Sequence, residues 1–143
     1  MTDNKKQDNK NVDMDELFQK ALYSAESAYA PYSKFRVGAA LLSEDGRVFT
    51  GCNVENRSFG LTICAERTAL FKGVSEGAKR FIALAISTPD SKKPVGPCGA
   101  CRQVISEFML PEAQVRFGGS SHERVNTSIG ELYPFDSLHD LAK

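Results

Sequence analysis

Residues 97–101 read Pro97-Cys98-Gly99-Ala100-Cys101, and an earlier stretch reads Cys64-Ala65-Glu66. Three cysteine thiolates can hold a tetrahedral zinc ion and leave its fourth position open to water. A carboxylate two residues after the first thiolate can move the protons of that water. A lone C-x-x-C pair is common in redox, structural zinc and haem sites, so the two motifs are informative only together. They predict a hydrolytic zinc site with ligands Cys64, Cys98 and Cys101 and with Glu66 as general acid and base.

Both motifs stand where helices are predicted to begin. One helix should start at or near Cys64 and run towards Gly77, and another should span Cys98 to Met109 and stop at Pro111. The positive end of each helix dipole favours the thiolate over the thiol. One metal ion would therefore join two separate helices across the sheet.

Arg67 follows the predicted acid–base residue directly. Three thiolates on a dication leave a net charge near minus one, which weakens the pull of the metal on a water proton. Arg67 could donate hydrogen bonds to a ligand sulfur and offset this charge. The alternative is an ordinary solvated arginine on a helix surface.

The remaining elements follow from hydrophobic periodicity and turn residues. Asp13 caps a first helix, with Glu16 as its capping-box partner and Pro31 as its end. Its apolar stripe comprises Met14, Leu17, Phe18, Ala21, Leu22 and Ala25. The predicted strands are Val37 to Leu42, Val48 to Asn53, Phe81 to Ile86, Val115 to Gly118 and Arg124 to Thr127, with an Asp-Gly turn between the first two. With a short helix or turn around Leu138, this order predicts an α/β fold, a three-layer α/β/α sandwich around a mixed five-stranded sheet.

Composition limits the class of protein. The 143 residues suit a single domain over 13–143, preceded by a polar tail over 1–12 that we expect to be disordered. Lys plus Arg and Asp plus Glu each number 18, so no basic excess favours a nucleic-acid partner. The sequence shows neither an apolar stretch of about 20 residues nor a signal-peptide core. We expect a cytoplasmic protein with no membrane partner.

Cys52 is the fourth cysteine of the chain. Its place in a predicted strand favours a packed free thiol. It could also complete a Cys₄ shell, which would make the site a non-catalytic structural zinc module. A C-x-x-C redox protein is a further alternative, but it leaves Cys64-Ala65-Glu66 without a role.

From about Asp15 to Leu141 the chain resembles the small homotetrameric zinc-dependent cytidine deaminases, which share the Glu and Pro-Cys-x-x-Cys pattern. The motifs that carry the resemblance are Ala30-Pro31-Tyr32-Ser33-Lys34-Phe35, Gly51-Cys52-Asn53-Val54-Glu55-Asn56, Cys64-Ala65-Glu66-Arg67-Thr68-Ala69 and Pro97-Cys98-Gly99-Ala100-Cys101-Arg102-Gln103. The resemblance implies one Zn²⁺ per subunit, a homotetramer and a nucleoside substrate. The implied reaction is hydrolysis of cytidine and 2′-deoxycytidine to uridine and 2′-deoxyuridine with release of ammonia, in pyrimidine salvage, by zinc-activated water and a glutamate proton shuttle.

The resemblance also implies substrate contacts. Asn53 and Glu55 match residues that bind the sugar hydroxyls, for which an amide and a carboxylate are suitable partners. Phe35 matches the ring that packs on the pyrimidine, and the backbone at Ala65 matches the segment that reads the base edge. Arg67 matches an arginine that hydrogen-bonds the zinc thiolates. From the residues alone, Asn53 and Glu55 could be polar strand-end residues, and Phe35 could be core.

The C-terminus departs from the family pattern. Family members often place an aromatic residue, given to a neighbouring subunit, three positions after the proline that follows Glu131-Leu132. Here Phe135 follows Pro134 directly. Phe135 or Tyr133 could substitute, or the pocket could close differently. Another cytosine-containing substrate, such as an aminonucleoside antibiotic or a polynucleotide, also stays open.

Overall fold

The computed structural model describes residues 12–142. The tail predicted to be disordered over 1–12 therefore lies outside the described residues except for Val12, which packs beside the first helix. The elements in chain order are α1 (Met14–Ala25), β1 (Gly38–Ser43), β2 (Val48–Cys52), η1 (Phe59–Leu61), α2 (Ala65–Ser75), β3 (Phe81–Ser87), α3 (Gly99–Ser106), β4 (Met109–Gly118), β5 (Arg124–Ser128), α4 (Ile129–Leu132) and η2 (His139–Ala142). None of the helices in this part of the chain has the length and apolar character needed to cross a bilayer.

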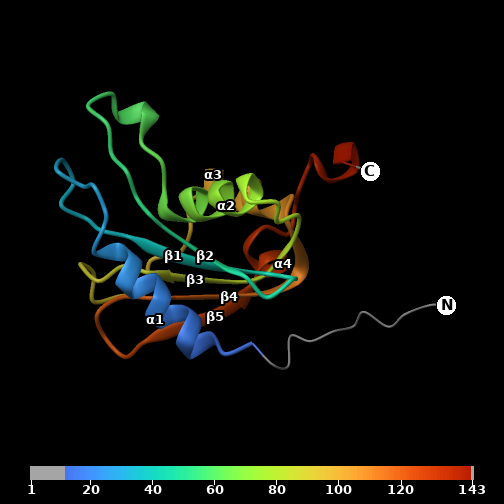
Figure 1. Ribbon diagram of the computed structural model, residues 1–143, viewed down its shortest axis with the longest axis horizontal. Helices are drawn as coiled ribbons and strands as arrows, with labels where there is room; N and C mark the ends of the chain where they lie inside the picture. Colours follow the sequence, from blue (N-terminus) through green and yellow to red (C-terminus); the bar gives the residue numbers. More distant parts are fainter. Residues whose placement is uncertain (1–11, 143) are drawn as a thin grey trace.

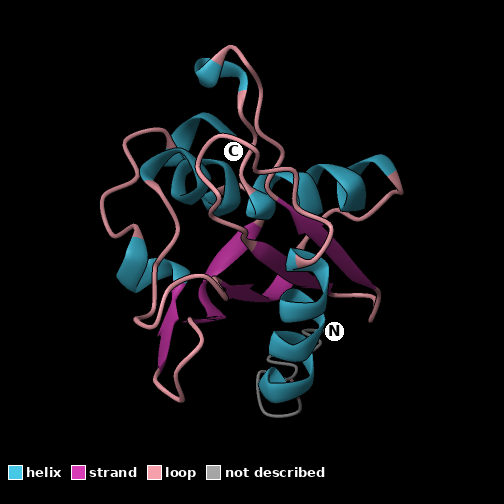
Figure 2. Cartoon of the chain, turned by 90° about the vertical axis from the view of Figure 1, so that its left-hand side faces the viewer, coloured by secondary structure: helices cyan, strands magenta, loops and turns pink. Residues whose placement is uncertain are grey.

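The five strands form one mixed sheet in the order β2-β1-β3-β4-β5. β3 and β4 run parallel, and the other neighbouring pairs are antiparallel. In Figure 1, α1 lies on one side of this sheet and α2 with α3 on the other, and Figure 2 shows helices on both sides of the strands. The predicted three-layer α/β/α sandwich is confirmed.

Each face of the sheet has its own core. The buried side chains under α1 are Met14, Leu17, Phe18, Ala21, Ala40, Ala83 and Ala85. The larger core, under α2, α3 and α4, includes Leu41, Phe49, Leu70, Phe81, Ile86, Ile105 and Val115. Residues of β3 contribute to both cores, as its unbroken apolar run predicts for a central strand.

Two glycines let helices approach the sheet closely. A Cβ atom added to Gly38 would lie 1.9 Å from the carbonyl oxygen of Ala21 in α1, and one added to Gly51 would lie 2.4 Å from the backbone nitrogen of Ala69 in α2. No larger residue fits at either position without displacing a helix. Gly51 thus determines how α2, and the residues at its start, sit against the sheet.

The end of α1 was predicted wrongly. The helix stops at Ala25, well before Pro31, and Leu22 of the predicted apolar stripe is 37% exposed. The chain leaves the helix because Tyr29 pairs with the residues after β2: its N–H donates to Asn53 O at 3.0 Å, and its carbonyl accepts from Glu55 N at 2.8 Å. A tertiary contact thus ends this helix before the proline can.

The end of α3 was also predicted wrongly. The helix finishes at Ser106, and Pro111 lies inside β4. β4 begins early because Met109 pairs with Phe81 of β3. The register then shifts, so that Ala83 pairs with Gln114, and Pro111 falls in the irregular stretch where a missing N–H is tolerated. The other predicted strands are confirmed to within one residue at each end, while η1 and α4 were not predicted.

Candidate functional site

Three cysteine sulfurs meet where α2 and α3 begin. Cys64 is the N-cap of α2 and Cys98 the N-cap of α3, while Cys101 lies in the first turn of α3. The three Sγ atoms lie within 4.8 Å of one another, and those of Cys64 and Cys98 are 3.9 Å apart. Two zinc–sulfur bonds of about 2.3 Å at a tetrahedral angle require a separation of about 3.8 Å. The sulfur positions therefore fit a tetrahedral zinc ion.

Hydrogen bonds hold the second cysteine motif in place. The Cys101 N–H donates to Cys98 Sγ at 3.4 Å. The Arg102 side chain donates from Nε to Pro97 O and from Nη1 to Leu132 O, each at 2.9 Å. Arg102 thereby ties the turn before α3 to α4, a role for which the sequence carried no signal beyond its place in the motif.

The thiols of Cys64 and Cys101 affect each other strongly. The pKa of Cys64 is lowered to about 5, first because the Cys101 thiol donates to its sulfur and then because Arg67 lies beside it. The pKa of Cys101 is raised, because its proton is held by the Cys64 sulfur and because the residue is buried. Zinc binds cysteine as the thiolate, so a dication bound here would favour deprotonation of all three thiols.

Arg67 reaches the cluster from the first turn of α2. Its Nη2 atom donates to Cys64 Sγ at 3.4 Å, and this hydrogen bond raises the pKa of the guanidinium. Its Nε atom is buried and has no partner among the described residues. The side chain therefore lies against a predicted ligand sulfur, as the sequence suggested, and not in solvent.

Glu66 is almost completely enclosed. The residue is 3% exposed, and burial raises the pKa of its carboxyl. The carboxyl lies beside the Cys101 thiol, and Glu66 lines the same pocket as Cys64 and Cys98. A buried carboxyl with a raised pKa suits both the donation and the removal of protons.

The pocket in front of these residues has a volume of about 290 Å³. It opens at the end of the sheet where β2 and β3 finish and β1 starts. Its lining residues are Ser33, Phe35, Val37, Asn53, Glu55, Thr62, Cys64, Ala65, Glu66, Ile86, Thr88, Val95, Gly96 and Cys98. All predicted substrate-binding positions are therefore brought together. Sequence reasoning missed Thr62, Thr88 and Val95, which belong to no motif and reach the pocket only through the fold.

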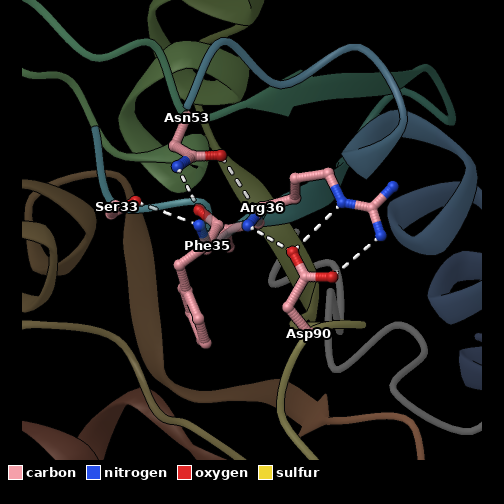
Figure 3. A network of polar contacts seen from close by, with 6 residues as sticks. Ser33, Phe35, Arg36, Asn53 and Asp90 are labelled. Atoms are coloured by element: carbon pink, nitrogen blue, oxygen red, sulfur yellow. Dashed lines mark hydrogen bonds and ion pairs between the residues drawn. The ribbon is translucent and has the colours of Figure 1, made fainter. Parts of the chain in front are cut away.

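Asn53 and Glu55 hold the backbone that forms one side of the pocket. The Asn53 side chain accepts from Val37 N and donates to Phe35 O, each at 2.8 Å (Figure 3). Glu55 Oε1 accepts from Tyr32 N at 2.9 Å and from Ser33 N at 3.2 Å. These contacts leave the Asn53 amide one N–H and one lone pair for a ligand. The Glu55 carboxylate, which also interacts with the Ser33 hydroxyl, keeps further acceptor capacity.

Phe35 is turned towards the pocket by its local backbone. Lys34, directly before it, has φ 57°, a left-handed conformation that is uncommon outside glycine. The Phe35 ring is partly buried and lines the pocket. Ala65 is the first residue of α2, so its N–H has no partner within the helix, and the residue lines the same pocket. An apolar ring and the first residue of a helix thus lie on one cavity.

Cys52 lies apart from the metal cluster. The candidate metal group found among residues 12–142 contains Cys64, Cys98 and Cys101 only. Burial raises the pKa of the Cys52 thiol, and the charge that opposes this rise comes from Lys72. The geometry therefore supports a packed free thiol and gives no support to the Cys₄ alternative.

The two candidate C-terminal aromatics differ in their surroundings. The Tyr133 hydroxyl donates to Gln103 Oε1 at 2.6 Å and is partly buried. Phe135 is 90% exposed and carries no such contact within the described residues. Of the two side chains, Phe135 is the one available to a second molecule.

Comparison with known proteins gives consistent matches. Residues 12–116 match the family described as the cytidine and deoxycytidylate deaminase zinc-binding region. A cytidine deaminase of Halalkalibacterium halodurans is 48% identical over 86% of this chain and 92% of its own length. One from Sporosarcina psychrophila is 47% identical over 86% of this chain and 90% of its own length. The crystal structure of a cytidine deaminase from Burkholderia pseudomallei has a TM-score of 0.82 at 46% identity, covering 86% of this chain and 98% of that one.

Replacing Cys64, Cys98 or Cys101 with serine will lower the zinc content of the purified protein from one ion per chain towards none, because two thiolates cannot hold the ion tightly. Elemental analysis by mass spectrometry measures this directly. Cys52→Ser is the matched control and will keep its zinc. Loss of zinc from the Cys52 variant would contradict the ligand set and favour a closed Cys₄ site.

Proposed function

The chain belongs to the cytidine and deoxycytidylate deaminase family, and from its site we infer how its residues remove the amino group of cytidine by hydrolysis. The protein is a zinc-dependent cytidine deaminase that converts cytidine and water to uridine and ammonia. One observation carries the assignment of roles: Cys64 and Cys98, two of three cysteines whose sulfurs have zinc-ligand spacing, line the same pocket as the buried Glu66. We extend the proposal to 2′-deoxycytidine, which offers the same base.

In this proposal Cys64, Cys98 and Cys101 hold the zinc ion. When bound there, zinc supplies Lewis-acid activation of a water molecule. Arg67 donates to Cys64 Sγ at 3.4 Å and so withdraws charge from one ligand. This contact reduces the negative charge that three thiolates would otherwise place beside the attacking water.

Glu66 moves the protons of the reaction. Its carboxylate takes a proton from the attacking water and places it on N3 of the cytosine ring, while the water oxygen bonds to C4. The carboxylate then takes the remaining proton from the new C4 hydroxyl and passes it to the amino group. The C4–N bond breaks, the C4 carbonyl forms, and ammonia leaves. Burial raises the pKa of this carboxyl, which favours its protonated form and so supports proton donation to the substrate.

The remaining pocket residues hold the nucleoside. The Phe35 ring packs on the face of the pyrimidine, and the Ala65 N–H donates to the polar edge of the base. Asn53 and Glu55, which hold the backbone on either side of Phe35, bind the sugar hydroxyls with the donor and acceptors that their backbone contacts leave unused. The pKa of Glu55 is lowered, chiefly by the Ser33 hydroxyl, so the carboxylate stays an acceptor.

The size of the pocket favours a free nucleoside over larger substrates. Its volume of about 290 Å³ stands at the lower end of small-molecule pockets, which begin near 300 Å³. Asn53 and Glu55 occupy the side where a polynucleotide would have to continue. A comparison of cytidine with cytosine, CMP and a cytosine-bearing oligonucleotide decides between these substrates.

The expected effect of Glu66→Gln is retention of zinc with a loss in kcat of at least about 100-fold, because glutamine cannot transfer protons. The loss of absorbance as cytidine becomes uridine measures the rate. Glu76→Gln, at the exposed C-terminal end of the same helix, is the control and will keep wild-type activity. Substantial turnover by a folded, zinc-loaded Glu66→Gln protein would refute the assigned role.

For Glu55→Gln we expect a KM for cytidine about tenfold higher or more, because a hydrogen bond to a charged acceptor contributes about 1.5–3 kcal/mol. The amide oxygen can still accept from Tyr32 N and Ser33 N, so the pocket wall is retained. Steady-state kinetics with cytidine gives the KM. An unchanged KM would show that this carboxylate does not contact the sugar.

We further propose that the protein is a homotetramer. Two segments project from the body in Figure 1, the green loop around residue 60 and the C-terminal segment. They expose Phe59, Leu61, Phe135 and Leu141, which are 72%, 67%, 90% and 80% accessible in the single chain. Exposed apolar side chains on projecting segments are typical of subunit contacts.

Native mass spectrometry is expected to show a complex of four chains, and Phe135→Ala should shift it towards smaller species at a given concentration, because the ring is no longer buried between subunits. Tyr23→Ala, which removes another exposed ring at 77% exposure from α1, is the control. A fully active monomeric wild-type protein would overturn this proposal.

A further inference from the structure

The main-chain ladder of β1 stops just before the pocket. Gly38 is the first residue of β1, and it pairs with Cys52 of β2 on one side and with Ser87 of β3 on the other. Residues 35–37 lie beyond this point and line or flank the pocket. On the β2 side one further backbone bond, from Asn53 N to Val37 O at 3.2 Å, continues the pairing. The other contacts that hold residues 35–37, described below, involve the side chains of Asn53 and Asp90.

Asn53 holds the segment on the β2 side through its contacts with Phe35 O and Val37 N. On the β3 side the contact is made by Asp90. Its Oδ2 atom accepts from Arg36 N at 2.8 Å and from Arg36 Nε at 3.1 Å, and its Oδ1 atom accepts from Nη2 at 2.9 Å (Figure 3). One carboxylate thus binds both the backbone and the guanidinium of Arg36.

This contact joins two sides of the pocket. Arg36 lies between the pocket residues Phe35 and Val37, while Asp90 lies between Thr88 and Val95 in the segment that follows β3. That segment continues through Gly96 to the metal-site residue Cys98. The contact between Arg36 and Asp90 therefore links the backbone next to Phe35 to the segment that leads to Cys98.

The Asp90 segment has a second attachment on its far side. Ser120 N donates to Ser91 O at 2.7 Å, and Ser121 Oγ donates to Lys92 O, also at 2.7 Å. Loss of the Asp90 contact would therefore leave the segment folded but free to move at the pocket. The Arg36 and Asp90 side chains are 44% and 26% exposed, so their pairing contributes little to global stability.

We propose that Arg36 and Asp90 form a positioning pair that sets the distance between the Phe35 side of the pocket and the segment leading to Cys98, and so determines affinity for the nucleoside. Neither side chain lines the cavity, so they act through their neighbours and are not catalytic residues. The inference rests on the proposed function, because its effect is on binding of cytidine. Bidentate pairing of a guanidinium with a carboxylate has the directional geometry that such a role requires.

The test compares Asp90→Asn and Arg36→Ala with Asp45→Asn in the zinc-loaded protein. Asp45 forms the same kind of pair, with its Oδ2 atom 2.9 Å from Arg47 Nη2, in the turn between β1 and β2 outside the pocket. We expect both pocket-side variants to raise the KM for cytidine about fivefold to tenfold, with kcat, zinc content and melting temperature close to wild type. The control will leave the KM unchanged. The double variant Arg36→Ala/Asp90→Asn will be no worse than the stronger single variant, because both remove one contact.

Hydrogen exchange of the substrate-free protein gives a readout independent of turnover. Asp90→Asn is expected to speed exchange at the Arg36 amide and in residues 88–96, whereas Asp45→Asn is not. An unchanged KM in an active enzyme, or a parallel loss of zinc, kcat and stability, would overturn the positioning role. If the wild-type protein does not deaminate cytidine, the proposed function fails, and unchanged exchange in Asp90→Asn would then independently overturn the pair.

Discussion

The three cysteine sulfurs lie within 4.8 Å of one another, so the fold has to stabilise negative charge at this point. Negative charges on neighbouring sulfurs repel one another, and a bound cation would favour the thiolate form of all three cysteines. Two helices begin at the cluster, and the dipoles of both favour negative charge there. Arg67 also donates a hydrogen bond to the Cys64 sulfur. Because Gly51 has no side chain, α2 packs closely against the sheet, and this places the N-terminus of α2 beside it.

The site lies at the end of the sheet where the regular strand pairing of β1 stops. Beyond Gly38 the contacts to residues 35–37 pass largely from backbone to side chains, with Asn53 on one side and Asp90 on the other. Asn53 therefore combines two tasks, since it holds the pocket wall and still offers polar atoms to a ligand. A substitution of Asn53 would alter both the backbone of the pocket and the binding of the ligand. The Arg36–Asp90 pair, in contrast, positions the pocket backbone without contacting the ligand.

Local signals in the sequence were sufficient for much of this structure. The cysteine motifs, the Asp-Gly turn and the Asp13 cap each depend on residues close together in the chain, and the structure has the corresponding elements there. The failures involve distant partners. α1 ends where Tyr29 meets the end of β2, and Pro111 lies in β4 because Met109 pairs with Phe81. Asp90 and Thr88 were not predicted to lie at or near the pocket, because only the pairing of distant strands brings them there.

The pocket contains two carboxyl groups, those of Glu66 and Glu55, in different environments. Burial raises the pKa of Glu66 beside the cysteine cluster, whereas hydrogen bonds from the Ser33 hydroxyl and from backbone N–H groups lower that of Glu55. One carboxyl is therefore shifted towards its protonated form, while the other remains an ionised acceptor. Because both line a cavity of about 290 Å³, a bound molecule must present a protonatable, polar ring to one and donor groups to the other. A nucleoside of cytosine meets both conditions, and the free base meets only the first.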